Sequence, residues 1–306
     1  MSNARLVGGA WQFRGQARSG LTACGPPQRE NVSISPSEGR KGSGAKMHSI
    51  DGDSWTRWTH EVRSAEFEGM LKDIPLGWDS TVLELGCGDG FQLSLLRRQF
   101  AHVFAIDPAH TPDPAVGCAF AFAETLPFDD RTFDLIVSNC VLEHLADRRL
   151  ALDESVRVLK PGGFMAHVVP SRFWKVASLL LNPIGYPLRI AEKWRAMRAV
   201  LHEGPMSKSI GRRHTPRPTI GQVISRWTCP PVHGTYPGHL SELRSYGRQC
   251  WAESFVHPQL VQLSNVPLVC ATQFGFLRFR FLSARKWLGR HGLGSSRVFV
   301  MQKLNG

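Results

Sequence analysis

The chain has 306 residues and a hydrophobic fraction of 42%, enough for one large α/β domain with additions or for two small domains. It lacks any run of about 18 apolar residues, so we expect no transmembrane helix. Residues 1–20 also lack the apolar stretch of a signal peptide. Seven cysteines, without a CxxC pair, favour reduced thiols and no zinc site, so we expect a cytoplasmic protein.

The formal net charge of +12 is unevenly distributed. Residues 51–170 carry a net charge of −9, whereas residues 171–306 carry +16. A basic half of this size fits an anionic partner, such as a membrane surface, a phosphorylated substrate or a nucleic acid. A solvated basic surface that aids solubility fits it equally well.

In chain order, residues 1–46 are rich in Gly, Ser, Arg and Pro, which predicts a disordered extension that ends just before Met47. Residues 54–71 show apolar and aromatic residues at helical spacing and predict a helix that packs on a sheet. Strands and helices then alternate. We expect strands over residues 82–85, 102–106, 118–123, 133–138 and 164–169, and helices over 91–100 and 142–159. This alternation predicts a Rossmann-like sheet with helices on both faces.

The pattern changes after Pro170. We expect helices over residues 174–181, 188–201 and 240–255, an irregular stretch over 204–238, and two last strands over 260–270 and 297–303. The predicted organisation is a disordered extension (1–46), a cofactor-binding core (47–170), and a part on the acceptor side (171–306). This last part would hold helices, an insertion and the final strands of the same sheet.

A glycine-rich turn carries the strongest chemical signal. The apolar strand before it ends at Leu85, and Gly86, Gly88 and Gly90 follow before the next helix begins at Phe91. Glycine lets the backbone approach a ligand closely, and the start of a helix offers unpaired N–H groups. A dinucleotide fingerprint needs a third glycine where this chain has Phe91, which disfavours NAD.

Four motifs in order resemble one enzyme family. The E-x-G-x-G-x-G pattern of residues 84–90 resembles motif I of the class I S-adenosylmethionine-dependent methyltransferases. AETLPFDD (123–130), LEH (142–144) and RVLKPGG (157–163) resemble segments of the methyltransferase type 11 family. The resemblance implies S-adenosyl-L-methionine as the cofactor. It also implies a Rossmann-like, mostly parallel sheet of seven strands whose last strand is antiparallel.

The resemblance also assigns cofactor-binding residues. It implies that Gly86 and Gly88 line the methionine part of the cofactor and that Glu84 orients its amino group. Asp107 would hold the ribose hydroxyls. Ala123 and Glu124 would border the adenine, and Asn139 would face the methionine part. Phe122 stands where many relatives carry aspartate, so adenine recognition would rest on backbone groups and stacking.

The candidate catalytic residue is His233. The PPVHG stretch of residues 230–234, with Glu242 and Trp251, resembles an arrangement in a bacterial subgroup of these methyltransferases. An imidazole with a pKa near ~6.5 can take a proton from an acceptor oxygen or nitrogen at neutral pH. The alternative is that His233 fixes its loop through backbone hydrogen bonds.

No metal site is expected, because the aspartates at 129, 130 and 134 have no further ligands clustered with them. Four basic residues are candidates for binding an anionic group of the acceptor, although each is also explained as surface charge: Arg172, Arg212, Arg213 and His214.

Residues 274–293 alternate aromatic and basic side chains. They fit a lid whose phenylalanines pack on the core, peripheral contact with a membrane, or binding of single-stranded nucleic acid. We favour the lid, and we rank nucleic acid last because no RNA-binding module is recognisable.

Together these features predict a methyltransferase that modifies an oxygen or nitrogen atom of a small, lipid-linked or glycan-linked acceptor, which would be anionic if the basic residues bind it. One alternative is an RNA methyltransferase that uses the basic half. The other is a non-catalytic S-adenosylmethionine-binding protein with a regulatory or assembly role.

Overall fold

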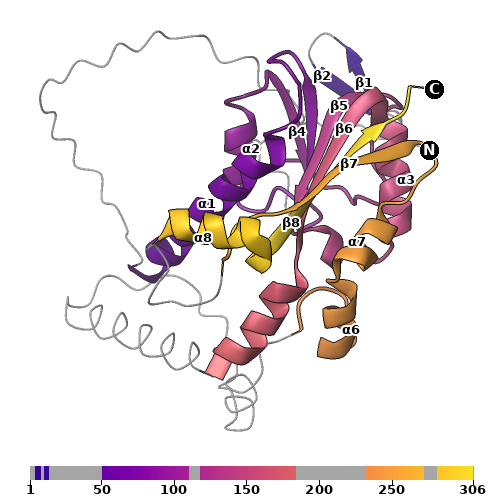
Figure 1. The fold of residues 1–306 in the computed structure, drawn as a ribbon. Helices are drawn as coiled ribbons and strands as arrows, with labels where there is room; N and C mark the ends of the chain where they lie inside the picture. The colour runs from indigo at the N-terminus through magenta and orange to yellow at the C-terminus, as the bar shows by residue number, and fades with distance from the viewer. Residues whose placement is uncertain are drawn as a thin grey trace, which may run out of the picture.

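A six-stranded sheet forms the centre of the molecule in the computed structural model (Figure 1). The structure describes residues 4–7, 10–13, 50–109, 118–183, 232–271 and 281–305. In spatial order the strands are β4 (His102–Ile106), β3 (Thr81–Leu85), β5 (Phe133–Asn139), β6 (Leu159–Pro170), β8 (Ser296–Lys303) and β7 (Leu260–Pro267). The first four strands are parallel, and β8 pairs antiparallel with both β6 and β7. The expected antiparallel last strand is therefore confirmed.

The expected number of seven strands is wrong for the described residues. The predicted strand over 118–123 makes a single parallel bridge, between Ala119 and Ile106 of β4. The chain then turns, because the N–H of Thr125 donates to the carbonyl of Phe122 at 3.1 Å. This turn ends the pairing after one residue and leaves Phe120 and Phe122 exposed.

Both faces of the sheet are covered, as the sequence predicts. Side chains alternate along β6 and β8, so Met165 and Phe299 face one core cluster while Phe164 and Val298 face the other. The first cluster includes residues of α3 (Arg148–Val158) and α7 (Arg248–Ser254), and the second includes residues of α1 (Ile50–Leu71) and α2 (Phe91–Leu96). The inner strands β3 and β5 are accordingly mostly apolar and buried.

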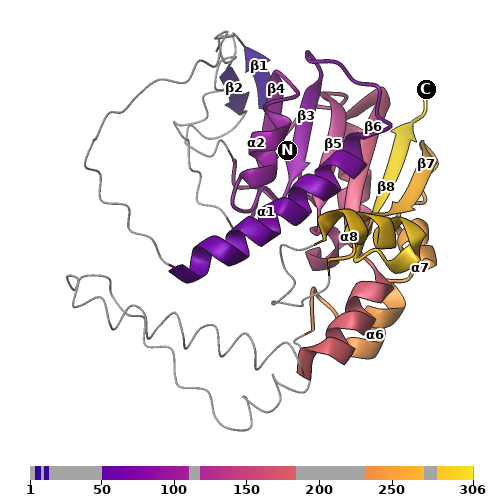
Figure 2. The same ribbon diagram turned by 60° about the vertical axis from the view of Figure 1, so that its left-hand side comes forward.

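Figure 2 shows α1 crossing in front of the sheet with α8 (Leu282–Leu288) beside it. Arg285 of α8 lies over the ring of Trp58 at 5.1 Å, and Lys286 pairs with Glu68 of α1 at 2.7 Å. The helix α8 therefore packs on α1, and a short π-helical turn, η3 (Gly289–Leu293), follows it. The rest of the basic aromatic segment, residues 274–280, lies outside the described residues, so its expected role as a lid stays a prediction.

Two predicted helices are each divided. The predicted helix over 142–159 is a 3₁₀ turn, η1 (Leu142–His144), followed by α3, which starts afresh because Asp147 accepts from the N–H of Leu150 at 2.9 Å. The predicted helix over 240–255 consists of α6 (His239–Ser245) and α7, with Gly247 between them. Residues 172–183 are helical, in agreement with the prediction over 174–181. The predicted helix over 188–201 lies outside the described residues.

Two short strands pair antiparallel within the segment expected to be disordered, β1 (Ala4–Val7) and β2 (Ala10–Phe13). For the rest of residues 1–46, disorder stays a prediction. Among the described residues, none of the helices combines the length and the apolar character needed to cross a membrane.

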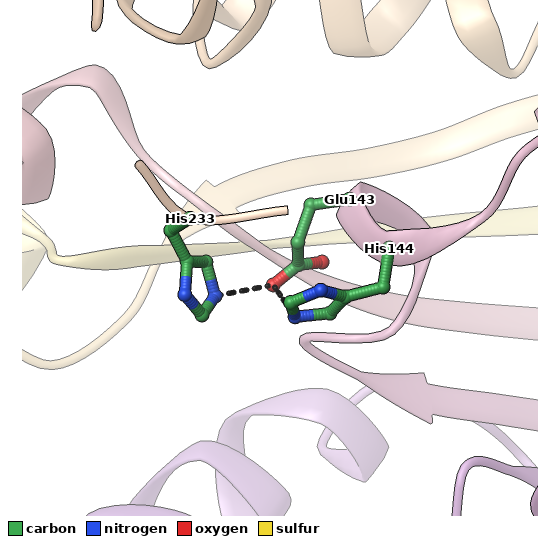
Figure 3. Close-up of side chains that lie close together, drawn as sticks. All are labelled: Glu143, His144 and His233. Atoms are coloured by element: carbon green, nitrogen blue, oxygen red, sulfur yellow. Dashed lines mark ion pairs between the residues drawn. The ribbon is translucent and has the colours of Figure 1, made fainter. Parts of the chain in front are cut away.

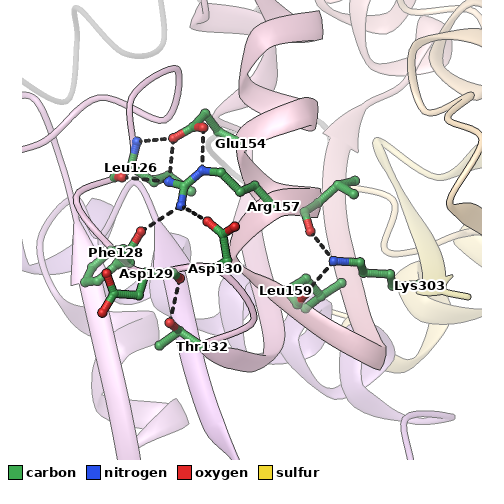
Figure 4. A network of polar contacts seen from close by, with 10 residues as sticks. Leu126, Phe128, Asp129, Asp130, Thr132, Glu154, Arg157, Leu159 and Lys303 are labelled. Carbon is green, nitrogen blue, oxygen red and sulfur yellow. Dashed lines mark hydrogen bonds and ion pairs between the residues drawn. The ribbon is translucent and has the colours of Figure 1, made fainter. Parts of the chain in front are cut away.

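Arg157 of the RVLKPGG motif fastens the AETLPFDD segment to α3 (Figure 4). Its guanidinium donates to the carbonyls of Phe128 and Leu126 at 2.8 and 3.0 Å, and it pairs with Asp130 and Glu154, each at 2.7 Å. The hydrogen bonds to Glu154 raise the pKa of Arg157. Both motifs are therefore joined in one structural network that holds the loop before β5.

Candidate functional site

The glycine turn between β3 and α2 is a tight cradle. Gly86, Gly88 and Gly90 have φ values of 76°, 50° and 78°, which side chains disfavour. A Cβ at Gly86 would lie 2.4 Å from Cγ2 of Val141, so the turn and the segment after β5 approach each other closely. The N–H of Gly88 donates to Oδ2 of Asp107 at 3.0 Å, which holds the turn over the end of β4.

A cleft opens above this turn. Strands β3 and β5, the turn and α2 supply part of its lining, and the helix α1 covers it from the other side. The lining residues are Thr59, His60, Arg63, Glu84, Gly86, Cys87, Gly88, Asp89, Phe91, Gln92 and Asn139. Four of the predicted cofactor-binding residues thus meet in one place: Glu84, Gly86, Gly88 and Asn139.

Three buried polar atoms of the cleft have no hydrogen-bond partner among the described residues: Oε2 of Glu84, Nε2 of Gln92 and Oδ1 of Asn139. Buried polar groups normally have partners, because leaving them unpaired costs about 1–3 kcal/mol each. Two of these atoms are acceptors suited to an ammonium group, and the third is a donor suited to a carboxylate. The cleft therefore fits the amino-acid end of a ligand such as S-adenosylmethionine.

The charges in the cleft are unusual. Burial raises the pKa of Glu84 to about 8, although Arg63 and Gln92 oppose the shift. Burial disfavours the charge of Arg63, but nearby acidic groups outweigh burial and raise its pKa: Cys140, Glu66, Glu143 and Asp89. The carboxyl group of Glu84 and the positively charged guanidinium of Arg63 together suit a zwitterionic ligand, which carries both an ammonium and a carboxylate.

The polar residues of α1 that border the cleft were not predicted from the sequence. Arg63 donates to the carbonyl of Asn139 at 3.0 Å, and Nδ2 of Asn139 donates to Glu66 and to Gln92, each at 3.1 Å. His60 pairs with Asp89 at 2.9 Å. The polar residues at 60, 63 and 66 lie on one face of the helix, and this spacing was a usable signal. The apolar residues of the same helix form a stronger pattern, and that pattern predicts only packing on the sheet.

The other predicted cofactor residues lie around the cleft. Asp107, at the end of β4, accepts from the N–H of Ala109 at 2.8 Å as well as from Gly88. Ala123 is buried in the core, and Oε1 of Glu124 accepts from the N–H of Ala146 at 3.3 Å. Neither Ala123 nor Glu124 lines the cleft, so their contact with adenine stays a prediction.

The cysteine expectation needs a correction. Cys87 of the glycine turn forms a disulfide with Cys118, 31 residues further along the chain. The N–H of Cys87 donates to the carbonyl of Ile106 at 3.3 Å, and Ala119 pairs with the same residue of β4. Both cysteines are thus brought to the end of one strand, although the sequence separates them and shows no CxxC spacing. Cys140, Cys250 and Cys270 are free thiols.

A second cluster of polar side chains lies just beyond β5 (Figure 3). Glu143 and His144 come from η1, and His233 comes from the loop before α6. Nε2 of His233 lies 3.4 Å from Oε1 of Glu143, and Nε2 of His144 lies 4.0 Å from the same oxygen. The Glu143 carboxylate is fully buried, whereas both imidazoles are partly exposed. Burial lowers the pKa of His144, against the pull of Glu143.

The loop that carries His233 is tightly held. The N–H of His233 donates to Glu242 at 3.3 Å, and its carbonyl accepts from the hydroxyl of Tyr246 at 3.1 Å. Gly234 has φ 81°, and a Cβ there would lie 2.4 Å from the carbonyl oxygen of Glu143. Glu242 also forms a buried ion pair with Lys175 at 2.5 Å. His233 is therefore fixed against Glu143 by its own backbone, which leaves its imidazole free to react.

Comparison with known proteins finds similarity to methyltransferases. A family model described as a methyltransferase domain matches residues 83–167. An uncharacterized methyltransferase of Mycobacterium tuberculosis is 27% identical over 181 residues, which cover 51% of this chain and 90% of that protein. The chain is an S-adenosylmethionine-dependent methyltransferase.

Other curated relatives match smaller parts of the methyltransferase. A ubiquinone biosynthesis O-methyltransferase of Nitrobacter winogradskyi is 32% identical, over 35% of this chain and 45% of that protein. A tRNA (carboxymethyluridine(34)-5-O)-methyltransferase of Arabidopsis thaliana is 32% identical, over 46% of this chain and 35% of that protein. A solved geranyl diphosphate C-methyltransferase of Streptomyces coelicolor A3(2) has a TM-score of 0.46 at 17% identity, with coverage of 85% and 86%.

The candidate anion-binding residues of the methyltransferase are only partly described. Nε of Arg172 donates to the carbonyl of Leu243 at 2.9 Å, so this guanidinium fastens the helix of residues 172–183 to α6. The other three, at positions 212, 213 and 214, lie outside the described residues.

Proposed function

We propose that this methyltransferase modifies an oxygen or nitrogen atom of a small, lipid-linked or glycan-linked acceptor that binds beside Glu143 and His233. The observation that carries the proposal is the position of this pair. Glu143 follows the cleft residue Asn139 by four positions, and Val141 between them packs against Gly86 of the cradle. Groups that can accept a proton thus adjoin the cofactor cleft.

In this proposal the cleft holds the methionine end of S-adenosylmethionine, whose sulfonium supplies the transferable methyl group. Glu84 and Asn139 accept from its amino group, and Arg63 and Gln92 donate to its carboxylate. Asp107 accepts from the ribose hydroxyls, as the family resemblance implies. Rate enhancement then comes chiefly from holding donor and acceptor in line.

His233 is the proposed general base. An acceptor hydroxyl or amine must lose a proton as it takes the methyl group, and the exposed side of the imidazole is open to it. The Glu143 carboxylate behind the ring would stabilise the imidazolium that forms. The names of the Nitrobacter and Arabidopsis relatives both specify O-methylation, which supports oxygen as the atom modified.

The cofactor assignment is tested by calorimetry with S-adenosylhomocysteine. Asp107→Asn should weaken binding by about 10- to 100-fold, because hydrogen bonds to a charged group are worth about 1.5–3 kcal/mol. Asp73→Asn, at an exposed carboxylate outside the cleft, is the matched control and should bind as the wild type does. A folded wild type that does not bind S-adenosylhomocysteine would overturn the proposal.

The acceptor is tested with methyl-labelled cofactor and cell extract. We expect label in a small, lipid or glycan fraction, and we expect that ribonuclease does not remove it. Label that ribonuclease releases would instead establish the RNA methyltransferase. Cofactor binding without turnover on any extract would favour the regulatory or assembly role.

A further inference from the structure

We propose that Glu143, His144 and His233 form a binding site for one divalent transition-metal ion at the acceptor side of the cleft. Each residue offers one ligand atom, and the three atoms lie within 4.8 Å of one another (Figure 3). The sequence gives no hint of such a site, because a loop 90 residues further along the chain supplies its third ligand.

The state of Glu143 is the independent observation. Its side chain has no exposed surface, and neither carboxylate oxygen accepts a hydrogen bond from any residue that the structure describes. A buried carboxylate without hydrogen bonds is costly unless a positive charge compensates it. The two imidazoles approach it at 3.4 and 4.0 Å, too far for good hydrogen bonds but suitable for ligands that surround a common ion.

The donor set indicates the class of ion. Imidazole nitrogens suit Zn²⁺, Co²⁺ and related ions, whereas Ca²⁺ and Mg²⁺ prefer sites made of oxygen atoms. Two histidines and one carboxylate also form a common catalytic zinc set, which leaves a coordination position open. Here both imidazoles are partly exposed, so the open position would face solvent and an incoming acceptor.

The surrounding structure restricts the ligands before any ion binds. The ring of His233 packs edge-on against Trp174 at 5.3 Å and against His144 at 4.7 Å. The backbone of its loop is bonded to Glu143 itself, since the N–H of Thr235 donates to the Glu143 carbonyl at 3.1 Å. Packing and backbone contacts that fix ligand orientation are typical of built metal sites.

The metal site rests on the proposed function for the identity of the acceptor, and it gives His233 a role other than that of general base. An imidazole nitrogen that binds a metal ion cannot accept a proton, so the ion and the base role of His233 exclude each other. With the ion bound, an acceptor hydroxyl at the open position would be more acidic, as metal-bound water is. Its proton would go to solvent while its oxygen bonds to the methyl carbon, and the bond from that carbon to the sulfonium sulfur would break and release S-adenosylhomocysteine.

The test is a titration of the full chain, stripped with chelator, with Co²⁺ followed by its visible absorption and with Zn²⁺ followed by calorimetry. We expect one ion per chain. Glu143→Gln and His233→Asn should each weaken binding about tenfold or more, because each removes a ligand. The matched control is His257→Asn, a histidine that lies 3.6 Å from Asp153 without a third ligand, and it should bind as the wild type does.

Failure to bind one ion per chain, or equal binding by wild type and both ligand variants, would overturn the metal site. Thermal melting shows whether each variant is folded. If Glu143→Gln or His233→Asn does not fold, His144→Asn, which changes the most exposed ligand, tests the same loss of metal binding. S-adenosylhomocysteine binding is measured on the same samples. If it persists where metal binding is absent, the metal site fails while the cofactor cleft stands.

Discussion

Glu84 is a buried carboxyl group in the cleft, and its ionisation depends on the fold. Its carboxyl group is 2% exposed at the end of β3, and burial raises its pKa from 4.5 to about 8. At a pH between 4.5 and about 8, Glu84 keeps its proton in the folded protein and loses it in the unfolded chain. The contribution of Glu84 to stability therefore falls as pH rises through this range, by up to about 5 kcal/mol.

The variant Glu84→Gln removes this dependence. Its free energy of unfolding, relative to that of the wild type, should increase steadily from pH 5 to pH 8. Urea denaturation at several pH values without cofactor measures the difference. Glu68→Gln, at an exposed carboxylate, should run parallel to the wild type. Parallel curves for Glu84→Gln would show that the carboxyl group is not desolvated.

At this scale the sequence predicts the residues whose role is local. Glu84, Gly86 and Gly88 lie in one short motif, so strand, turn and helix start place them together. Arg63 and Glu143 were missed because their roles come from packing between elements far apart in sequence. No spacing rule connects Glu143 with His233, since tertiary contacts alone bring η1 to the loop before α6.

The glycine turn is also an element joined covalently to its neighbour. The Cys87–Cys118 disulfide closes a loop across β4 that includes residues 110–117, which the structure does not describe. For a separation of 31 residues, loss of chain entropy in the unfolded state corresponds to about 3–4 kcal/mol.

Reduction should therefore destabilise the protein. We expect the reduced protein, and Cys118→Ser, to lose about 3 kcal/mol of unfolding free energy in urea relative to the oxidised wild type. Cys250→Ser, at an exposed free thiol, serves as the control and should unfold as the wild type does. Peptide mapping without reductant that finds Cys87 and Cys118 unlinked would contradict the pairing.

Among elements, the order of strands and helices was predictable, and their ends were less so. Periodicity locates a helix, but it does not show that Asp147 starts α3 afresh or that Gly247 separates α6 from α7. A full strand was predicted over residues 118–123, but a strand needs a partner along its length, and the sequence does not show whether one is present. Only Ala119 makes a bridge to β4.

At the scale of the whole molecule, the last strand of the sheet is joined to the junction of α3 and β6. Lys303 of β8 is buried, and its ammonium donates to the carbonyls of Val156 and Leu159 at 2.6 and 2.8 Å (Figure 4). These carbonyls lie at the end of α3 and the start of β6. Burial lowers the pKa of Lys303, so the charge is held by these carbonyl contacts.

Lys303→Met should lower the unfolding free energy by about 2 kcal/mol, because two buried carbonyls lose their charged donor. Chemical denaturation of the two proteins measures this loss. Lys286→Met, which breaks an exposed pair with Glu68, should cost less than about 1 kcal/mol. An equal effect of the two variants would show that burial of Lys303 contributes nothing.

The position of β8 between β6 and β7 also determines how long one sheet edge stays unpaired during translation. Strands β3 to β6 lie before residue 171, so they emerge from the ribosome well before residues 296–303, and the edge of β6 stays unpaired until those residues follow. An open apolar edge of this kind invites pairing with other chains. At about 5–20 residues per second, the nascent protein spends several seconds or more in this state. Its dependence on chaperones should therefore concentrate in that interval.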